Sequence, residues 1–275
     1  MPGTPATTPR LPRYGDLGAD LLAVTPRRQA WLLARPLAMA ALYVALAANH
    51  QWILALAVLA AMFPAMVAVI HDLLHRSIGL SPRANQRWLT VMGVVALQSG
   101  HAIQATHLAH HRRFPNSDDP EAYVARMPLA RALLEGPIYP CRLWAWARAN
   151  RPELRRRTTV EAAAHGILGI GSAGLLPWTP IPFTYAAAMF VGGALFPAIS
   201  VNLLHHIDGE SPLTWTRTVR GIVLPVLTLG SGYHLEHHLY PRVPSPNYRR
   251  LALRLRPTLD QHAAHGYRII RSRKA

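Results

Sequence analysis

Two stretches of this chain contain neither lysine nor arginine: residues 36–70 and residues 159–206. Apolar side chains dominate both stretches, whereas the segments around them are basic and polar. A helix that crosses a bilayer needs about 20 residues, so each stretch is long enough for two crossings. The pattern therefore predicts an all-α membrane protein with four transmembrane helices in two hairpins.

Short polar or proline-rich segments place the turns of these hairpins. The sequence Asn-His-Gln-Trp at 49–52 separates a first span, which begins near Trp31, from a second span. The proline-rich segment 177–182 separates a third span, 159–178, from a fourth span, 183–204. A cluster of prolines is typical of a turn because proline lacks the N–H that a helix interior needs.

The distribution of charge distinguishes a membrane protein from a nucleic-acid-binding protein. The formal net charge is +16, an excess that by itself fits either nucleic acid or an anionic membrane as a partner. Here the basic residues flank the apolar stretches, and the cytoplasmic loops of membrane proteins retain lysine and arginine. We therefore predict an integral, multi-pass membrane protein with both termini in the cytoplasm and no nucleic-acid partner.

Composition divides the chain into three segments. Residues 1–30 are rich in proline and threonine and lack the apolar core of a signal peptide, which predicts a poorly ordered cytoplasmic N-terminal arm. Residues 31–257 form the membrane domain, and 258–275 form a basic C-terminal tail. The apolar segment 221–232 is too short to cross a bilayer and is expected to lie on the membrane or dip into it. A soluble protein with buried helices is the alternative, which the lengths of the uncharged stretches disfavour.

Histidines gather at the ends of the predicted spans. His-x-x-x-His follows the second span at 71–75, His-x-x-His-His occurs at 107–111 and again at 234–238, and His205 and His206 end the fourth span. Positions i, i+3 and i+4 of a helix share one face. The predicted topology brings these ten histidines, out of 15 in the chain, to the cytoplasmic face of the membrane.

Imidazole ligands without thiolates favour zinc, copper, iron or nickel. The single cysteine, Cys141, excludes a thiolate cluster within the chain. One tetrahedral zinc takes four ligands, and this set offers far more. Two metal ions would use them and leave positions open for a reactant. Beside helices that exclude water, such a set indicates two irons that activate dioxygen, the co-substrate, against an apolar substrate.

The three histidine boxes, in this order around two hairpins, resemble those of the membrane fatty acid desaturase superfamily, which includes acyl desaturases and carotenoid ketolases and hydroxylases. The flanking sequences "HHRRFPNSDDPEAY" and "YHLEHHLYPRVPSPNYRRL" also look like desaturase boxes. The resemblance covers roughly 36–257 and implies that 31–257 is a desaturase-like membrane domain with a cytoplasmic, histidine-rich di-iron cap. The metal ligands that the boxes imply are His71, His75, His107, His110, His111, His234, His237 and His238.

One further element is similar to animal-type acyl-CoA desaturases, an Asn-x-x-x-His sequence at the end of the fourth span. The resemblance implies that His206 is the ninth imidazole ligand and that Asn202 reaches a metal through a water molecule. Helical periodicity alone does not separate His205 from His206, and we favour His206. Glu161 and His165 lie four residues apart in the third span, where they either pair with each other or line a substrate channel.

Several carboxylates flank the boxes. A ligating imidazole usually donates its second N–H to a carboxylate or a carbonyl, so Asp118 and Asp119 are candidate partners of the ligands. Asp72 and Glu236 are expected to face solvent. His101, six residues before its box, is expected to contact solvent or to support a ligand.

The resemblance implies a membrane-bound, oxygen-dependent fatty acyl desaturase that introduces a double bond into an acyl chain. Its substrate would be a lipid or an acyl thioester, and a separate ferredoxin- or cytochrome-type donor would supply electrons. Small residues at 192–194 would leave room for the acyl chain. A carotenoid ketolase or hydroxylase, or another lipid hydroxylase of the superfamily, is the alternative. A membrane zinc hydrolase needs few ligands, and a metal transporter carries its ligands near the bilayer midplane, so neither class fits as well.

Overall fold

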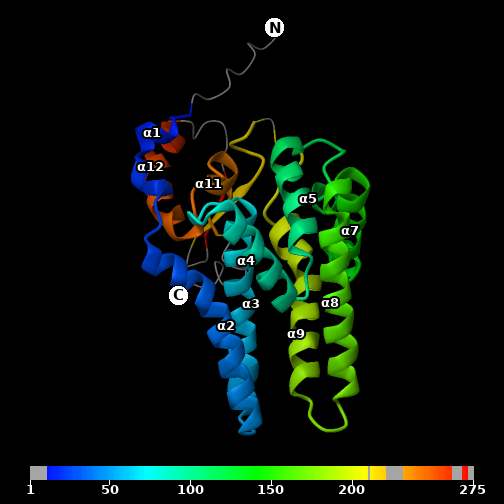
Figure 1. Ribbon diagram of the computed structural model, residues 1–275. Helices are drawn as coiled ribbons and strands as arrows, with labels where there is room; N and C mark the ends of the chain where they lie inside the picture. The colour runs from blue at the N-terminus through cyan, green and yellow to red at the C-terminus, as the bar shows by residue number, and fades with distance from the viewer. Residues whose placement is uncertain (1–10, 210, 221–231, 262–267, 272–275) are drawn as a thin grey trace.

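The computed structural model describes residues 11–209, 211–220, 232–261 and 268–271. All but the last residue of the apolar segment predicted at 221–232 lies outside these ranges. The described part is mainly helical (Figure 1). Its helices are α1 (Tyr14–Leu17), η1 (Ala19–Leu22), α2 (Pro26–Ala48), α3 (Trp52–Leu74), α4 (Pro82–Val95), α5 (Gly100–Arg113), η2 (Ala122–Arg126), α6 (Leu129–Glu135), α7 (Tyr139–Asn150), η3 (Pro152–Leu154), α8 (Arg155–Gly174), α9 (Ile181–Phe196), η4 (Pro197–Asn202), α11 (His234–Leu239), η5 (Ser245–Asn247) and α12 (Tyr248–Gln261).

Two long helical hairpins form the lower half of the molecule in Figure 1, α2 with α3 and α8 with α9. The predicted turns are present, because α2 ends at Ala48 and α3 begins at Trp52, while 175–180 separates α8 from α9. Buried side chains of α3 pack against Tyr43 of α2 and Met189 of α9. The Tyr43 hydroxyl also donates a 2.6 Å hydrogen bond to the Ile181 carbonyl, which ties the two hairpins together.

Three of the four predicted spans are long and apolar enough to cross a membrane, within Ala19–Ala48, Trp52–Leu74 and Ile181–Asn202. The third predicted span is not among them. It corresponds to α8, which begins with three arginines, contains Glu161 and is rich in glycine. The structure is thus consistent with a membrane protein that has three candidate spans, and the fourth span remains a prediction.

A third hairpin, formed by the shorter helices α4 and α5, was not expected from the hydrophobic pattern. These two helices of 14 residues each pack beside α3 and α8. Two glycines allow their close approach, since a Cβ at Gly93 would lie 2.7 Å from the Gln98 carbonyl oxygen and one at Gly100 would lie 2.6 Å from the Leu89 carbonyl oxygen. The hairpin matters for the site because α5 carries the second histidine box.

The N-terminal helices α1 and η1 pack against α12 near the C-terminal end of the chain. Leu17 and Leu21, in the segment that was predicted to be a poorly ordered arm, are buried against α12 and the residues after α11. Arg254 of α12 donates to Asp20, with N–O distances of 2.7 and 2.8 Å. The N-terminal arm is therefore helical from Tyr14, and α12 extends past the boundary predicted at 258.

The all-α prediction needs one correction. Two short strands, β1 (Arg217–Arg220) and β2 (Arg268–Arg271), pair in parallel with Arg217 opposite Arg268. Four-residue strands of this kind give too short an alternation to stand out in a sequence.

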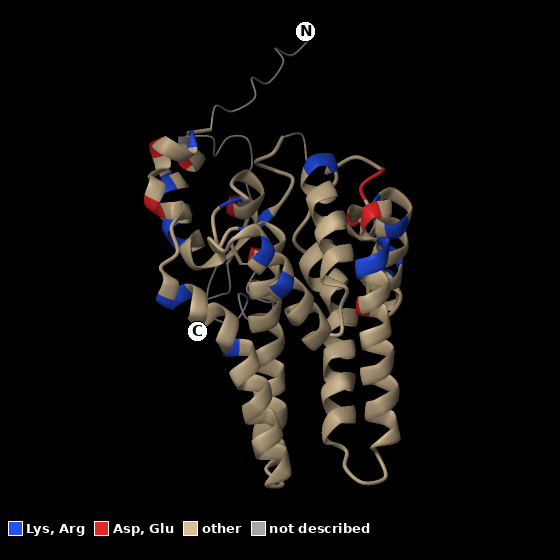
Figure 2. Ribbon diagram, in the orientation of Figure 1, with Lys and Arg blue, Asp and Glu red and all other residues tan. Residues whose placement is uncertain are grey.

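Figure 2 shows that charged residues gather in the upper half of the molecule, whereas the lower half of the long hairpins carries none.

Candidate metal centre

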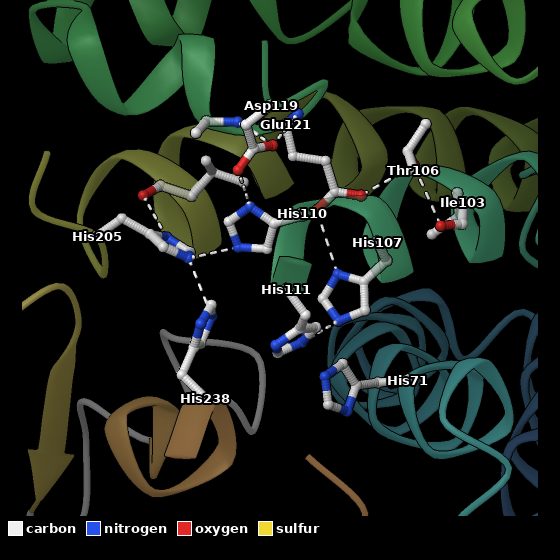
Figure 3. A network of polar contacts seen from close by, with 12 residues as sticks. His71, Ile103, Thr106, His107, His110, His111, Asp119, Glu121, His205 and His238 are labelled. Carbon is white, nitrogen blue, oxygen red and sulfur yellow. Dashed lines mark hydrogen bonds and ion pairs between the residues drawn. The ribbon is translucent and has the colours of Figure 1, made fainter. Parts of the chain in front are cut away.

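Four separate segments bring their histidines to one place at the upper end of the hairpins. The first box follows from the last turn of α3, the second lies on α5, and the third lies on α11. The fourth contribution is His205, just beyond the π-helical turn η4. Most of these side chains are buried. Figure 3 shows His71, His107, His110, His111, His205 and His238 facing one another.

The first group of imidazoles comes from all three boxes, with both histidines of the first box, two of the second and one of the third. His71, His75, His107 and His237 each offer a ring nitrogen, and these nitrogens all lie within 4.8 Å of one another. Nε2 of His71 is 3.0 Å from Nε2 of His237. His111 completes the group, with its Nε2 2.8 Å from that of His237 and 3.2 Å from that of His107.

The second group is made by His110, His205 and His238, whose nitrogens also lie within 4.8 Å of one another. Nε2 of His205 is 3.0 Å from that of His110 and 3.2 Å from that of His238. His234 joins them, with its Nε2 3.1 Å from the same atom of both His205 and His238. Five imidazoles thus surround one point and four surround a neighbouring point.

The partners of the outer ring nitrogens fix the tautomers of three of these histidines. Nδ1 lies 2.7 Å from Asp119 in His110, 3.2 Å from Glu121 in His107 and 2.9 Å from the Val201 carbonyl in His205. Carboxylate and carbonyl oxygens only accept, so each Nδ1 carries the proton and each Nε2 of the neutral ring presents a lone pair.

Lone pairs that face one another across 3 Å need a cation between them. Nε2 of His110 and Nε2 of His205 are such a pair at 3.0 Å. Two nitrogens that are each about 2.1 Å from one metal ion, at roughly a right angle, lie about 3.0 Å apart. Nε2 of His75 is in addition buried and has no hydrogen-bond partner among the described residues. The donor set therefore fits two metal ions that prefer imidazole, iron included.

Burial keeps most of these rings in the form that binds a metal. Desolvation lowers the pKa of His111, His234, His237 and His238 well below its usual value, and the neighbouring imidazoles lower it further. For His110, burial also lowers the pKa, but the hydrogen bond and charge of Asp119 outweigh it, and the pKa is raised. A carboxylate of this kind makes an imidazole a stronger donor to a metal.

The carboxylates around the groups are distributed differently from the prediction. Asp119 is buried beside His110, whereas Asp118 is 63% exposed and pairs with Arg113. Glu121, which the sequence analysis did not single out, contacts His107 and accepts a 2.9 Å hydrogen bond from Thr106. Its position in the same Asp-Asp-Pro-Glu segment was the signal that could have identified it.

Two further carboxylates were expected to face solvent but are buried. Asp72 accepts hydrogen bonds from the Ser245 N–H at 2.8 Å, from the Ser245 hydroxyl at 2.6 Å and from the Ser77 hydroxyl. It thereby fastens the first box to the loop that follows the third. Glu236, within the third box, accepts a hydrogen bond from the Thr218 hydroxyl of β1.

The structure reverses our preference between the two adjacent histidines. His205 lies in the second group, while the His206 ring contacts the guanidinium of Arg217. The Asn202 amide nitrogen donates to the carbonyls of Val124 and Met127, at 2.8 and 2.7 Å. The prediction assumed that 202 and 206 share a helix face, but the helix ends at Asn202. Neither Asn202 nor His206 belongs to the two groups.

His101 and Glu161 pair with each other. His101 was predicted to contact solvent or to support a ligand, and Glu161 to pair with His165 or to line a substrate channel. Nδ1 of His101 lies 2.7 Å from the Glu161 carboxylate, and both side chains are buried between α5 and α8. The Ser99 hydroxyl donates to the other oxygen of Glu161 at 2.6 Å. His165 lies outside this contact, and its Nε2 has no hydrogen-bond partner in the described part of the chain.

An apolar cavity ends at the two groups. Histidines of both groups line it, and most of the remaining wall is apolar, with α3 as the largest contributor. Of the small residues expected to leave room for a substrate, Gly193 lines the cavity, whereas Gly192 packs against Phe63. The residues that line the cavity are Phe63, Met66, Val67, Ile70, His71, Leu74, Ala96, Gln98, Ile103, His107, His110, Glu121, Tyr139, Leu143, Gly193, Phe196, Ser200, Val201, His205 and His234.

Comparison with known proteins agrees with this geometry. No curated protein matches the sequence. The family described as fatty acid desaturase matches residues 49–268, which contain all three histidine boxes and His205. Because this match covers well over half of the chain, and the boxes it contains converge on one centre, the chain belongs to the fatty acid desaturase family.

Proposed function

We propose that this protein is a membrane-bound, di-iron, oxygen-dependent desaturase that introduces a double bond into the acyl chain of a lipid or an acyl thioester. The observation that carries the proposal is the apolar cavity with imidazoles of both groups at one end. An apolar chain that enters this cavity comes to lie against both groups at once.

Each part of the site has a definable role in this proposal. The nine imidazoles would hold two irons, which, when bound, supply the oxygen chemistry that removes hydrogens from an unactivated carbon chain. Asp119 and Glu121 hold the His110 and His107 rings in the tautomer that leaves Nε2 free. Side chains such as Phe63, Met66 and Ile70 exclude water and align the chain.

The membrane arrangement and the partners are part of the same proposal. We place both termini and the metal centre in the cytoplasm, because the arginines of the described part lie in the half of the molecule that carries the centre (Figure 2). Four spans would then have α8 cross beside α9. Electrons would come from a separate ferredoxin- or cytochrome-type donor.

One observation favours hydroxylation or ketolation of a lipid, such as a carotenoid, as a second candidate function. Tyr139 and Ser200 line the cavity, and their hydroxyls are buried without a hydrogen-bond partner among the described residues. Buried hydroxyls normally find a partner. The oxygen atom that such a reaction adds to the chain would provide one, whereas a desaturated acyl chain would not.

Expression in a lipid-producing host distinguishes the two candidates. The chain and its His237→Ala variant are expressed at equal membrane abundance in a host that also makes β-carotene, and total lipids are analysed by mass spectrometry. New unsaturated acyl chains that require His237 support the desaturase. Oxygenated carotenoids with unchanged acyl chains support the second candidate instead, and no difference between the two variants contradicts both.

A further inference from the structure

A second cleft lies between the first turns of α2, Ala68 of α3 and the start of η5. It has a volume of about 550 Å³. Three arginines, Arg27, Arg28 and Arg35, contribute to its wall. The remaining lining residues are Thr25, Trp31, Leu32, Ala68, Ser245 and Pro246. The cavity beside the metal centre shares none of these residues, so the cleft is a separate feature.

The positive charge of the cleft is not neutralised by the described residues. None of the three arginines forms a salt bridge with a described carboxylate. The charge of Asp72 reaches Arg35 through space, but the two side chains form no salt bridge. Asp72 already accepts hydrogen bonds from Ser245 and Ser77. The cleft therefore attracts an anion.

Arg35 does not simply extend its side chain toward water. One of its terminal nitrogens reaches the Ala65 carbonyl of α3 at 3.4 Å, and its Nε is buried without a hydrogen-bond partner among the described residues. A long cationic side chain near a helix end usually places its charge in water. A buried guanidinium N–H without an acceptor is costly and rare, so this one calls for an acceptor from outside the chain.

The position of the cleft identifies the kind of anion. Trp31, on the cleft wall, is 60% exposed and lies within a candidate membrane span. Exposed tryptophans in such helices are typical of the level of the lipid headgroups. The N-terminus of α2, which follows Thr25, adds the positive end of a helix dipole at the same level. Phosphate is the anion that a membrane presents at this depth.

We propose that this cleft binds the phosphate of an anionic phospholipid, with Arg35 as the inner contact and Arg27 and Arg28 as the outer contacts. The acyl chains of the lipid would lie along the exposed faces of α2 and α3. The proposal rests on the charge and burial of this cleft and is independent of the reaction at the metal centre.

Native mass spectrometry of the detergent-purified chain tests this site. Protein is titrated with dioleoylphosphatidylglycerol or with dioleoylphosphatidylcholine, and retained lipids are counted. We expect one phosphatidylglycerol to be retained in preference to phosphatidylcholine. The double variant Arg27→Gln/Arg28→Gln should bind phosphatidylglycerol about 5-fold more weakly for each arginine removed. Arg35→Gln is a second variant, which tests the inner contact.

A matched control separates a site from general surface charge. Arg83 and Arg87, on α4, are also exposed and lie outside the cleft. Arg83→Gln/Arg87→Gln removes the same charge and should leave retention unchanged. Equal loss in both double variants would overturn the proposal, as would equal retention of the two lipids. Displacement of the lipid by millimolar inorganic phosphate would also overturn it, because it would show a site for a small anion.

Discussion

Replacing His205 tests whether His205, as the structure shows, or His206, as the sequence analysis favoured, is the metal ligand. Nε2 of His205 lies 3.0 Å from that of His110, 3.1 Å from that of His234 and 3.2 Å from that of His238. It is therefore the common neighbour of the other three nitrogens in its group. His205→Ala removes one of four donors and leaves the first group of five intact.

The expected loss of metal affinity in His205→Ala can be bounded by the loss measured when a residue that only orients a ligand is removed. Loss of a residue that only orients a ligand lowers metal affinity by about 10- to 100-fold, and loss of a ligand should exceed this. We therefore expect His205→Ala to fall from about two irons per chain to about one and to lose turnover. His206→Ala loses a contact to Arg217 near the surface, so it should retain both irons and lose less than about 1 kcal/mol of stability.

The assay is the iron content of detergent-purified, anaerobically handled protein, read together with lipid profiles of the expressing host. Both variants need equal membrane abundance, because a lost metal can also destabilise a fold. Full iron content in His205→Ala together with iron loss in His206→Ala would refute the geometric reasoning. It would restore the Asn-x-x-x-His assignment.

Four further predictions concern the supporting residues, the cavity, the membrane and pH. Glu121→Ala should weaken metal binding by about 10- to 100-fold, whereas Asp118→Ala, at an exposed position, should not. Metal titration measures both affinities, and equal affinities in the two variants would contradict the prediction. Gly193→Leu should restrict the enzyme to shorter or no substrates, because a Cβ there would lie 2.2 Å from the Gln98 amide nitrogen; an unchanged product profile would mean that the chain takes another path. Reporter fusions after Pro180 and Arg271 should report opposite sides of the membrane, and the same side for both would contradict four spans. The metal-free protein should lose thermal stability as pH falls below about 6.5, since the buried imidazoles have folded pKa values below their unfolded ones and only the unfolded chain takes up the protons; a melting temperature that is flat from pH 7.5 to 5.5 would contradict it.

The sequence was sufficient for features that depend on composition and local spacing. Uncharged stretches located the hairpins, and the i, i+3, i+4 spacing located the second and third boxes, because both signals lie within one element. The choice between His205 and His206 depended instead on where a helix ends. The chain leaves helical geometry after Asn202, so the spacing rule applied to a segment that is not a helix.

Features that depend on long-range packing left no readable signal. Asp72 is buried by a loop 173 residues later in the chain, and Glu161 is held by His101, 60 residues earlier. Both carboxylates look like ordinary charged residues until the tertiary contact is known. The short arm at Tyr14–Leu22 likewise has too few apolar residues to indicate that α12 covers it.

The contact between Asp72 and Ser245 also bears on the order in which the molecule is made. The first two boxes are synthesised long before the third, so during translation their imidazoles stand at the membrane surface with an incomplete partner set. Only when Ser245 and α12 have emerged can Asp72 be covered and Leu17 and Leu21 find their packing surface. Metal loading is therefore expected after translation. A chain that stops before 234 would insert its hairpins and yet leave both groups of histidines unfinished, so residues 234–275 contain the part of the sequence that completes the metal centre.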